Sequence, residues 1–482
     1  MEEQIETDGK RVAARAIKRT SPSEMGPDLF EGELHSPEER RAAGKTLRER
    51  VPRESHGKWK ERPDRPDPIE ILIASDEGRI PELVPIRHGR MLTSPFAFLR
   101  GAAAGMASDL STTPTTGIRV QACGDCHLMN FGAFATPERN LIFDINDFDE
   151  TLPAPWEWDL KRLAASLIAA GRYIGLKERD SRAAALSAAR SYRRSMARYA
   201  DMRAMEVWYD RIDVNQVIAE LPAAARRRLG ARVKKARDQS VAEHDFPKLV
   251  ESARAQPRIK DNPPLIFHEQ GSRRKEAHEN VKDAFKTYRS TLADPYRVLL
   301  DRFRLYDMAI KVVGVGSVGT FCALMLFMAD ENDPLFLQVK QANSSVLEPY
   351  AGKSVYSNHG QRVVMGQRLM QSASDMMLGW TEGKLRGRHF YLRQLRDMKL
   401  SAVMETMEPE TLRAYAKLCG WTLARAHARS GDASMISGYL GSSDVFDEAV
   451  AKFAVAYADQ TESDHRSLRK AVRDGRLEAV TV

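Results

Sequence analysis

The chain has 482 residues, 43% hydrophobic and 29% charged, which is more than one hydrophobic core usually organises, so we expect two lobes with accessory segments. Lys+Arg total 74 against 66 Asp+Glu, and this mild excess of +8 suits an anionic ligand such as a nucleotide. Four cysteines are too few for a disulfide framework, and the longest apolar run, 321–329, is about half of what crosses a bilayer. Because charged residues instead of an apolar core follow Met1, we expect a cytoplasmic protein with no membrane partner.

Residues 1–67 are dense in Arg, Glu, Lys and Pro and hold few large apolar side chains. Such a segment buries too little surface to offset its ordering entropy, which predicts a charged, extended or partly disordered arm. Its interleaved Arg and Glu favour a solvated segment over a nucleic-acid-binding tail. After Ser94-Pro95 breaks the chain, an Ala-rich, helix-like stretch runs to Leu110.

Residues 117–149 combine short apolar runs with Gly, Asn, Asp and Pro, a pattern typical of strands and loops. A helix with one buried face follows Trp158, and Asp159 in its first turn favours the helix dipole. Residues 177–304 are charged and predicted to be largely helical. They include a basic cluster, formed by Arg226, Arg227, Arg228, Arg232, Lys234, Lys235 and Arg237. This cluster is a candidate site for an acidic partner, and a solvated helix face is the alternative.

A second strand-rich region is expected from Met308 to about Lys399. Within it, 365–377 includes a helix-like stretch and 389–395 alternates as a strand does. Helical spacing returns from Leu412 to Ala428, and charged helices complete the chain.

Two acidic segments point to phosphate chemistry. Segment 124–132, Gly-Asp-Cys-His-Leu-Met-Asn-Phe-Gly, places Asp125 and Asn130 five residues apart on a loop. Segment 143–150, Phe-Asp-Ile-Asn-Asp-Phe-Asp-Glu, holds four carboxylates within seven residues. Phosphoryl transfer needs a carboxylate that orients or deprotonates the acceptor hydroxyl and oxygen ligands for Mg²⁺. Crowded carboxylates repel unless a cation or basic groups lie among them, which favours a magnesium site over simple turn capping.

Segment 311–321 predicts a strand, a glycine-rich turn and a second strand. Its turn residues are Gly314, Gly316, Ser317 and Gly319. Glycines let the backbone approach phosphates closely, and their amides supply hydrogen-bond donors. A dinucleotide-binding fold needs a helix directly after the glycines, whereas 321–328 is a continuous apolar run suited to a strand. The segment therefore favours a kinase-type hairpin over ATP.

Residues 335–340 alternate so that the apolar side chains share one face of a strand and Lys340 lies on the other. This places an ammonium group in a cleft, where it can hold nucleotide phosphates. An ordinary lysine at a strand end is the alternative, and the preceding glycine hairpin favours the nucleotide-binding interpretation.

Glu348 is a candidate ion-pair partner of Lys340. With Ser345 it fits an S-x-x-E capping box equally well, and Pro349 disfavours helical geometry at Glu348. Both interpretations stay open from the sequence.

Cys123 and Cys126 form a C-x-x-C pair next to His127. A redox pair or a zinc site is the alternative interpretation of this segment, but the sequence offers no second ligand pair at comparable spacing. We interpret His127 as a group that orders the loop, with a role near the transferred phosphate as its second candidate function.

Three stretches carry a family resemblance. They are Arg90-Met91 with Ser94-Pro95-Phe96-Ala97-Phe98-Leu99-Arg100-Gly101, the segment 124–132, and Asn146-Asp147-Phe148-Asp149-Glu150. From roughly Arg65 to the C-terminus the chain resembles an uncharacterised bacterial family, domain of unknown function 2252. That family is grouped with the protein-kinase-like fold, near the aminoglycoside and choline phosphotransferases.

The resemblance implies roles for individual residues. Asp125 resembles the catalytic-loop aspartate and Asn130 the metal-binding asparagine. Asp147 resembles the aspartate that chelates magnesium, and Asp149 is a candidate second ligand. Asp159 resembles the aspartate that braces the catalytic loop.

The glycine turn resembles the phosphate-covering loop, and Lys340 resembles the strand lysine. In ordinary kinases these elements precede the catalytic loop, whereas here they follow it, which implies a circular permutation. The helix from Leu412 to Ala428 resembles the helix that normally runs into the catalytic loop. A permutation is tolerated where the original ends lie close together and the new ends open in an exposed loop.

The expected fold is therefore α+β, a two-lobed protein-kinase-like fold, circularly permuted, with a small β-rich lobe and a larger helical lobe. The divisions are 1–67 (charged arm), 68–304 (first part of the helical lobe, with the catalytic and metal-binding loops), 305–399 (β-rich nucleotide-binding lobe) and 400–482 (second part of the helical lobe). The adenine edge is expected against the strand at 390–395.

We expect an ATP-dependent phosphotransferase that uses ATP and Mg²⁺ and phosphorylates a hydroxyl of a small molecule facing Asp125. One alternative is a nucleotidylyltransferase or a catalytically silent ATP-binding protein on the same fold. Another is a basic nucleic-acid-binding protein that uses the basic cluster and the N-terminal arm.

Overall fold

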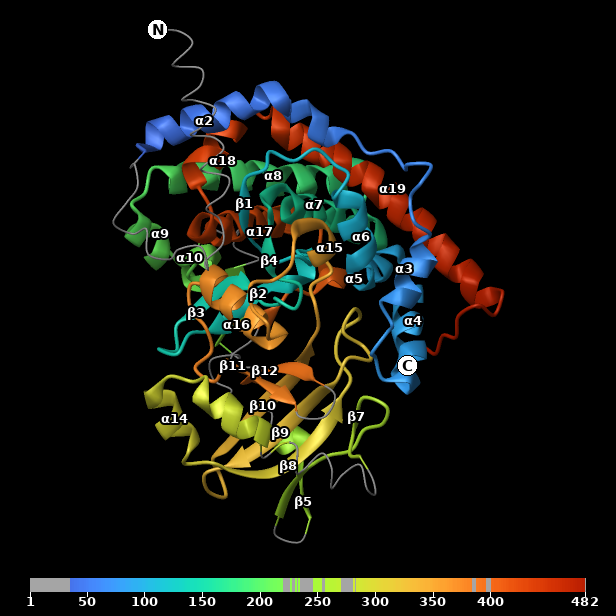
Figure 1. Ribbon diagram of the computed structural model, residues 1–482, viewed down its shortest axis with the longest axis vertical. Helices are drawn as coiled ribbons and strands as arrows, with labels where there is room; N and C mark the ends of the chain where they lie inside the picture. The colour runs from blue at the N-terminus through green and yellow to red at the C-terminus, as the bar shows by residue number, and fades with distance from the viewer. Residues whose placement is uncertain are drawn as a thin grey trace.

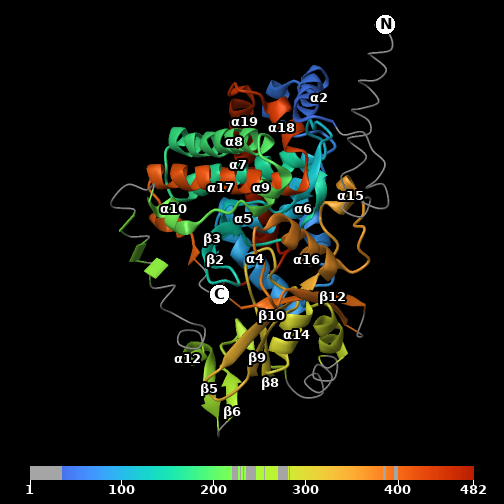
Figure 2. The same ribbon diagram turned by 90° about the vertical axis from the view of Figure 1, so that its left-hand side faces the viewer.

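The computed structural model describes residues 35–219, 226–227, 230–231, 233–234, 246–253, 256–269, 281, 283–383, 387–395 and 400–481. It is a mixed α+β structure in which most helices gather at one end and a six-stranded sheet lies at the other (Figure 1). The view turned by 90° shows the same separation (Figure 2). Among these residues, no helix combines the length and apolar character needed to cross a membrane.

The first described helix, α2 (Pro37–Arg50), begins with a capping box between Ser36 and Glu39, and a 3-10 helix (Arg53–Gly57) follows. The extended arm expected over 1–67 is therefore helical at 37–50 and 53–57, while residues 1–34 lie outside the described residues. The composition did not predict α2 because this helix buries only a narrow stripe, at Gly44 and Leu47. The stripe packs on α18 (Ala433–Leu440), so a few apolar side chains are enough to hold the helix in place.

Short helices connect α2 to the first strands and run along one side of the molecule (Figure 1). They are α3 (Pro68–Ala74), a 3-10 turn (Pro81–Leu83), α4 (Val84–Leu92), α5 (Pro95–Gly101) and α6 (Ala103–Leu110). The Ser94 side chain caps α5 by accepting a hydrogen bond from the amide of Ala97. The helical stretch expected up to Leu110 is confirmed, with a break at Ala102.

The short strands and loops predicted over 117–149 are confirmed, and one further strand, β4, follows them. The strands are β1 (Arg119–Ala122), β2 (Phe131–Ala135), β3 (Leu141–Ile145) and β4 (Leu152–Pro155). β1 pairs with β4, while β2 pairs with β3 and with the short β13 (Leu400–Ser401). In the β2–β3 hairpin Phe131 stands opposite Ile145, so the two acidic segments meet at one end of the hairpin.

Helices from the two ends of the chain share one core. They are α7 (Trp156–Tyr173), α8 (Glu178–Ala200), α17 (Pro409–Ser430) and α19 (Val445–Arg473), with the short α9 (Ala204–Tyr209) and α10 (Val214–Ala219) at the side. The helix predicted over 412–428 is confirmed as α17, which lies against α8 in both views (Figures 1 and 2). A Cβ at Gly420 of α17 would lie 2.2 Å from the carbonyl oxygen of Ala188 in α8, so the two backbones approach closely.

The six-stranded sheet is antiparallel and has the order β11-β12-β10-β9-β8-β7. Its strands are β7 (Ile266–Phe267), β8 (Arg304–Lys311), β9 (Cys322–Met328), β10 (Pro334–Ala342), β11 (Gly379–Gly383) and β12 (Arg388–Gln394). The strands expected on both sides of the glycine turn, at 335–340 and at 389–395 are thus confirmed. α15 (Glu348–Ala351) and α16 (His359–Met370) lie between β10 and β11 in the chain.

The segment before residue 305 also contributes to the six-stranded sheet, through β7. This segment holds α12 (Phe246–Leu249), β5 (Val250–Ala253), β6 (Gln256–Ile259), β7 and α14 (Asp294–Leu300). Tyr288, Leu292 and Leu300 are buried against Phe327 and Leu337 of the sheet. The charged composition of 177–304 did not indicate that its second part packs on the sheet, because only a few apolar residues make this contact.

Candidate functional site

A cleft of about 440 Å³ lies between the six-stranded sheet and the end of the β2–β3 hairpin. The acidic segment contributes Asn146 and Asp147, and the glycine turn contributes Gly314 and Ser317. From the sheet, β10 contributes Gln338 and Lys340, and β12 contributes Arg393 and Gln394. The cleft therefore joins the two segments that the sequence singled out as chemically informative.

Lys340 lies at the centre of this junction. Its ammonium group is 2.6 Å from Oδ2 of Asp149 and 3.9 Å from Oδ1 of Asp147, and it lies 5.3 Å from the centre of the Tyr391 ring. Burial disfavours the ammonium, but Asp147 and Asp149 outweigh this effect and raise the pKa of Lys340 well above its usual range. Lys340 is therefore a charged group at all physiological pH values.

The four crowded carboxylates differ in their closest partners. Asp144 is fully buried and accepts a 2.6 Å hydrogen bond from Arg425. Asp149 accepts from Lys340 and from the Tyr391 hydroxyl. Basic side chains from β10 and α17 thus separate these acids, which the sequence pattern alone did not reveal.

The other two acids differ from them. Glu150 accepts a 2.7 Å bond from the amide of Val346, and burial raises its pKa to about 7 despite the opposing charge of Arg362. Asp147 lies in the cleft with its side chain 33% exposed and has Lys340 only at 3.9 Å. Burial, and then the charge of Asp149, raise the pKa of Asp147, so a cation bound in the cleft would stabilise the ionised form of this carboxylate.

Asp149 shows the opposite shift. Burial alone would raise its pKa, but Lys340 and the Tyr391 hydroxyl outweigh burial and lower it. The adjacent acids of the Asp-Phe-Asp segment therefore divide into an ion-paired carboxylate and a carboxylate open to the cleft. Asp149 is ion-paired with Lys340, so Asp147 is the stronger candidate metal ligand.

The carboxylate of Asp125 is held by Arg162 of α7. Nε of Arg162 donates a 2.6 Å hydrogen bond to Oδ1 of Asp125, and Nη2 donates to the carbonyl of Leu99. Burial raises the pKa of Asp125, and Arg162 followed by Arg100 offsets part of this rise. Asp125 keeps a 24% exposed side chain, so it is accessible despite the ion pair.

His127 orders the loop, as its sequence position suggested. Its Nδ1 accepts a hydrogen bond from the amide of Met129 and caps the short 3-10 helix Leu128–Asn130. Burial, reinforced by Arg100 and Arg162, lowers the pKa of His127 well below its usual range. The ring is therefore neutral, with Nε2 as its N–H, 3.9 Å from Asp125.

Asn130 and Asp159 fix the same loop from two sides. Nδ2 of Asn130 donates a 2.7 Å bond to the carbonyl of Asp125, so the amide oxygen is the atom that Asn130 would offer to a cation. The buried carboxylate of Asp159 accepts from the amides of Cys123 and Gly124 and lies 3.2 Å from Nε2 of His427. Asp159 thus contacts the loop that the family resemblance implied it would brace.

The glycine turn rests on the N-terminal helices. Nη1 of Arg79 donates a 2.6 Å bond to the carbonyl of Val318, and Arg90 donates to the carbonyl of Gly314. Gly314 and Gly319 have φ values of +69° and +89°, which favour glycine. A Cβ at Gly316 would lie 3.0 Å from the carbonyl oxygen of Arg100. The carbonyls of Gly314 and Val318 thus anchor the turn to the N-terminal helices. Gly314 and Ser317 also line the cleft.

The ion pair expected between Lys340 and Glu348 is not formed, because Asp149 occupies that position. Glu348 instead lies 4.0 Å from Nδ1 of His359, and it is not among the cleft-lining residues. The capping box is not formed either, since the Ser345 hydroxyl accepts from the amide of Leu347 and α15 has no side-chain cap. From α16, the buried Arg362 donates to the carbonyl of Asp149.

Cys123 and Cys126 lie with Asp159 close enough for their ligand atoms to share a metal ion. Both thiols are buried, and burial raises the pKa of each, which disfavours the thiolate that zinc binding requires. Because Asp159 already accepts two amide hydrogen bonds, the cluster is best explained as loop structure.

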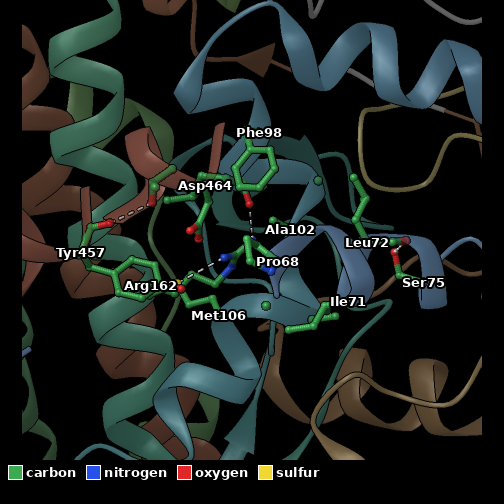
Figure 3. A pocket seen from close by; sticks show the side chains of 15 residues that line it. Pro68, Ile71, Leu72, Ser75, Phe98, Ala102, Met106, Arg162, Tyr457 and Asp464 are labelled. Atoms are coloured by element: carbon green, nitrogen blue, oxygen red, sulfur yellow. Dashed lines mark hydrogen bonds between the residues drawn. The ribbon is translucent and has the colours of Figure 1, made fainter. Parts of the chain in front are cut away.

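A second cavity, of about 30 Å³, lies on the far side of Arg162, among α3, α6 and α19 (Figure 3). Phe98, Met106 and Tyr457 line it, and Asp464 lies at its edge. It has room for about two water molecules and is too small for a substrate.

Residues 79–471 match the family described as an uncharacterised protein conserved in bacteria, DUF2252. The chain belongs to this family. No curated protein and no solved structure match the chain.

Several residues of the DUF2252 site were missed in the sequence. Arg162 follows Asp159 by three residues on one helix face, and this spacing could have indicated a contact with the same loop. Arg362, Arg393 and Arg425 carry no local signal of this kind. The basic cluster at 226–237 lies largely outside the described residues, so nucleic-acid binding stays the less favoured alternative.

Proposed function

We propose that this protein binds Mg·ATP in the cleft and transfers the γ-phosphoryl group to a hydroxyl of a small molecule. The observation that carries the proposal is the contact of Lys340 with Asp149, 191 residues apart in the chain, beside the glycine turn and Asp147. Phosphoryl transfer depends on this combination of phosphate-binding amides, a lysine and metal-binding oxygens.

The order of elements in the sheet supports a kinase-like nucleotide site. The glycine turn joins β8 to β9, Lys340 lies on the next strand, β10, and helix α16 follows before β11. Protein kinases arrange their glycine-rich loop, strand lysine and following helix in this order. The departure is Arg362, which stands on α16 where kinases carry a glutamate.

The contact between α17 and β1 supports the circular permutation. The amide of Gln121 in β1 donates a 3.1 Å bond to the Ser430 hydroxyl at the end of α17. A Cβ at Gly431 would lie 2.5 Å from the Val120 side chain. The end of α17 thus lies beside the strand that leads into the Asp125 loop, where an unpermuted chain would connect the two directly.

Each residue of the site has a defined task in the proposed reaction. Lys340 and Arg393 would neutralise phosphates, while Asp147 and Asn130 would hold Mg²⁺ through carboxylate and amide oxygens. The cation, when bound, supplies charge neutralisation along the phosphates. Asp147 fits this task because it faces the cleft without a short ion pair. The acceptor oxygen bonds to the γ-phosphorus, the bond to ADP breaks, and Asp125 accepts the hydroxyl proton.

Thermal unfolding with and without Mg·ATP tests the proposal. A ligand that binds the folded state at 100 times its Kd stabilises it by about 2.7 kcal/mol. We expect a magnesium-dependent rise of Tm in the wild type and a much smaller rise in Asp147→Asn, with Asp213→Asn as the control on a carboxylate outside the cleft. The absence of any ATP-dependent rise in the wild type would contradict the proposal.

One observation favours a second candidate function, transfer of AMP or silent binding of ATP. Arg162 pairs with Asp125, and a guanidinium partner makes a carboxylate a weaker base. Incubation with γ-labelled and α-labelled ATP separates the candidates. Transfer of the γ label to an acceptor supports phosphotransfer. Incorporation of label into an acceptor only from α-labelled ATP supports AMP transfer.

A further inference from the structure

Another pocket, distinct from the cleft and from the 30 Å³ cavity, has a volume of about 190 Å³ and opens on the other side of the glycine turn. Its lining includes Val315 of the turn and Met129 of the loop that carries Asp125. Phe96 and Arg100 of α5 line it as well. Since Gly314 and Ser317 face the cleft, the turn separates the two spaces. The pocket therefore lies where an acceptor would approach the phosphate end of a nucleotide.

Arg100 is the unusual residue of this pocket. Its Nε is buried without a hydrogen-bond partner, and among the described residues its guanidinium forms no ion pair within 4.0 Å. Its guanidinium carbon lies over the Phe96 ring, 5.8 Å from the ring centroid. A partly buried guanidinium without a hydrogen-bonded acceptor is costly, which indicates that an anionic group completes it.

The surroundings of Arg100 leave its charge uncompensated. Burial lowers the pKa of Arg100 below its usual range, and the charges of Asp125 and Glu405 offset only part of this effect. Arg90, at the same pocket, donates to the carbonyl of Gly314 and adds a second positive charge. Glu405, an exposed residue, is the acid at the rim. The pocket thus has a net positive lining.

Arg100 is also placed close to Asp125. Arg162 bridges the two segments, because it donates to the carboxylate of Asp125 and to the carbonyl of Leu99, the residue before Arg100. An acceptor anchored at Arg100 would therefore present its other end to Asp125. This arrangement also gives a task to the side chain of Arg100, whereas Arg90 of the same motif supports the glycine turn.

We propose that this pocket binds the acceptor, and that the acceptor is a small hydroxylated acid whose carboxylate or phosphate group pairs with Arg100. This inference rests on the proposed function, since it names the substrate class for the same reaction. Arg100 would act as a binding residue that fixes the anionic end, while Asp125 faces the hydroxyl to be phosphorylated.

Calorimetric titration of the full chain tests the inference with defined probes. These are inorganic phosphate, D-glycerate and glycerol 3-phosphate, compared with neutral glycerol and cationic choline. We expect the anionic probes to bind the wild type and Arg100→Gln to weaken them about tenfold or more, the factor for one lost hydrogen bond to a charged group. Arg179→Gln, at an exposed site away from both pockets, serves as the control and should bind as the wild type does.

Glu405→Gln provides a variant that should fold normally, because Glu405 is exposed. Removing this rim acid should tighten binding of the anionic probes about twofold. Equal probe affinity in the wild type, Arg100→Gln and Glu405→Gln would overturn the inference, and so would binding of glycerol or choline in preference to the anions.

Stabilisation by Mg·ATP, measured on the same proteins, separates this inference from the proposed function. Arg100→Gln should keep the Mg·ATP-dependent rise of Tm while losing the anion affinity. If Arg100→Gln loses the ATP effect and keeps the anion affinity, Arg100 belongs to the nucleotide site and the inference fails. If the wild type shows Arg100-dependent anion binding but no ATP effect, the anion site stands and the phosphotransferase function fails.

Discussion

Nε of Arg162 donates a 2.6 Å hydrogen bond to the carboxylate of Asp125, 37 residues earlier in the chain. Arg162 is only 2% exposed, and the same guanidinium also holds the carbonyl of Leu99. One buried side chain of α7 therefore ties together the loop that carries Asp125 and the helix α5. This link sets both the ionisation of Asp125 and the position of the neighbouring pocket.

We expect Arg162→Gln to destabilise the protein by about 3 kcal/mol, because it leaves the mostly buried carboxylate of Asp125 without its cationic partner. Adding Asp125→Asn to this variant should recover part of the loss, which a double-mutant cycle in urea measures as a coupling energy above about 1 kcal/mol. The exposed Arg179→Gln should change stability by less than about 0.5 kcal/mol. A coupling energy near zero would show that the pair contributes nothing.

The adjacent acids Asp147 and Asp149 should respond differently to the same change. Asp149→Asn removes the close partner of the buried Lys340 and should cost about 3 kcal/mol in the absence of ligand. Asp147→Asn should stay within about 1 kcal/mol of the wild type, because Asp147 has only a 3.9 Å contact and repels Asp149. Urea unfolding at pH 7 measures both. A larger loss for Asp147→Asn than for Asp149→Asn would refute this division of tasks.

Glu150 should make stability depend on pH. Burial raises its pKa from the model-peptide value of 4.5 to about 7 in the folded state. Between these values the folded state binds a proton that the unfolded state has lost, so the free energy of unfolding falls as pH rises from about 4.5 to 7. Glu150→Gln removes this dependence.

The stability of Glu150→Gln relative to the wild type should therefore increase steadily between pH 5 and pH 7.5 and then level off. Urea unfolding at four or five pH values across this range gives the difference directly. A difference that does not change with pH would mean that Glu150 is ionised in the folded protein throughout the range.

Gly420→Ala tests the close packing of α17 on α8. The new methyl group would lie 2.2 Å from the carbonyl oxygen of Ala188, so one backbone must shift, and we expect a loss of about 3 kcal/mol. Gly105→Ala in α6 is the matched control, because nothing lies within 4 Å of its Cβ position. This control should stabilise the protein by up to about 1 kcal/mol through helix propensity. Equal effects of the two substitutions would contradict the close approach.

Local patterns predicted much of the fold. The period of apolar residues indicated α7 and α17, and the glycine-rich turn between apolar runs indicated the β8–β9 hairpin. The prediction failed where a few side chains anchor a polar segment, as in α2 and in the segment 246–303, because composition measures average burial and not a narrow contact.

The sequence by itself singled out the candidate residues for the proposed chemistry: the acids at 125 and 147, the glycine turn and a lysine on a strand, each recognised from its immediate neighbours. Only the tertiary structure decided their partners. It paired Lys340 with Asp149 instead of Glu348, placed Arg162 against Asp125 and left Arg100 open to a pocket. The physical reason is that periodicity specifies which face of a strand or helix is buried. The charged partner of a side chain on that face comes from a segment far away in the chain, which the local pattern does not specify.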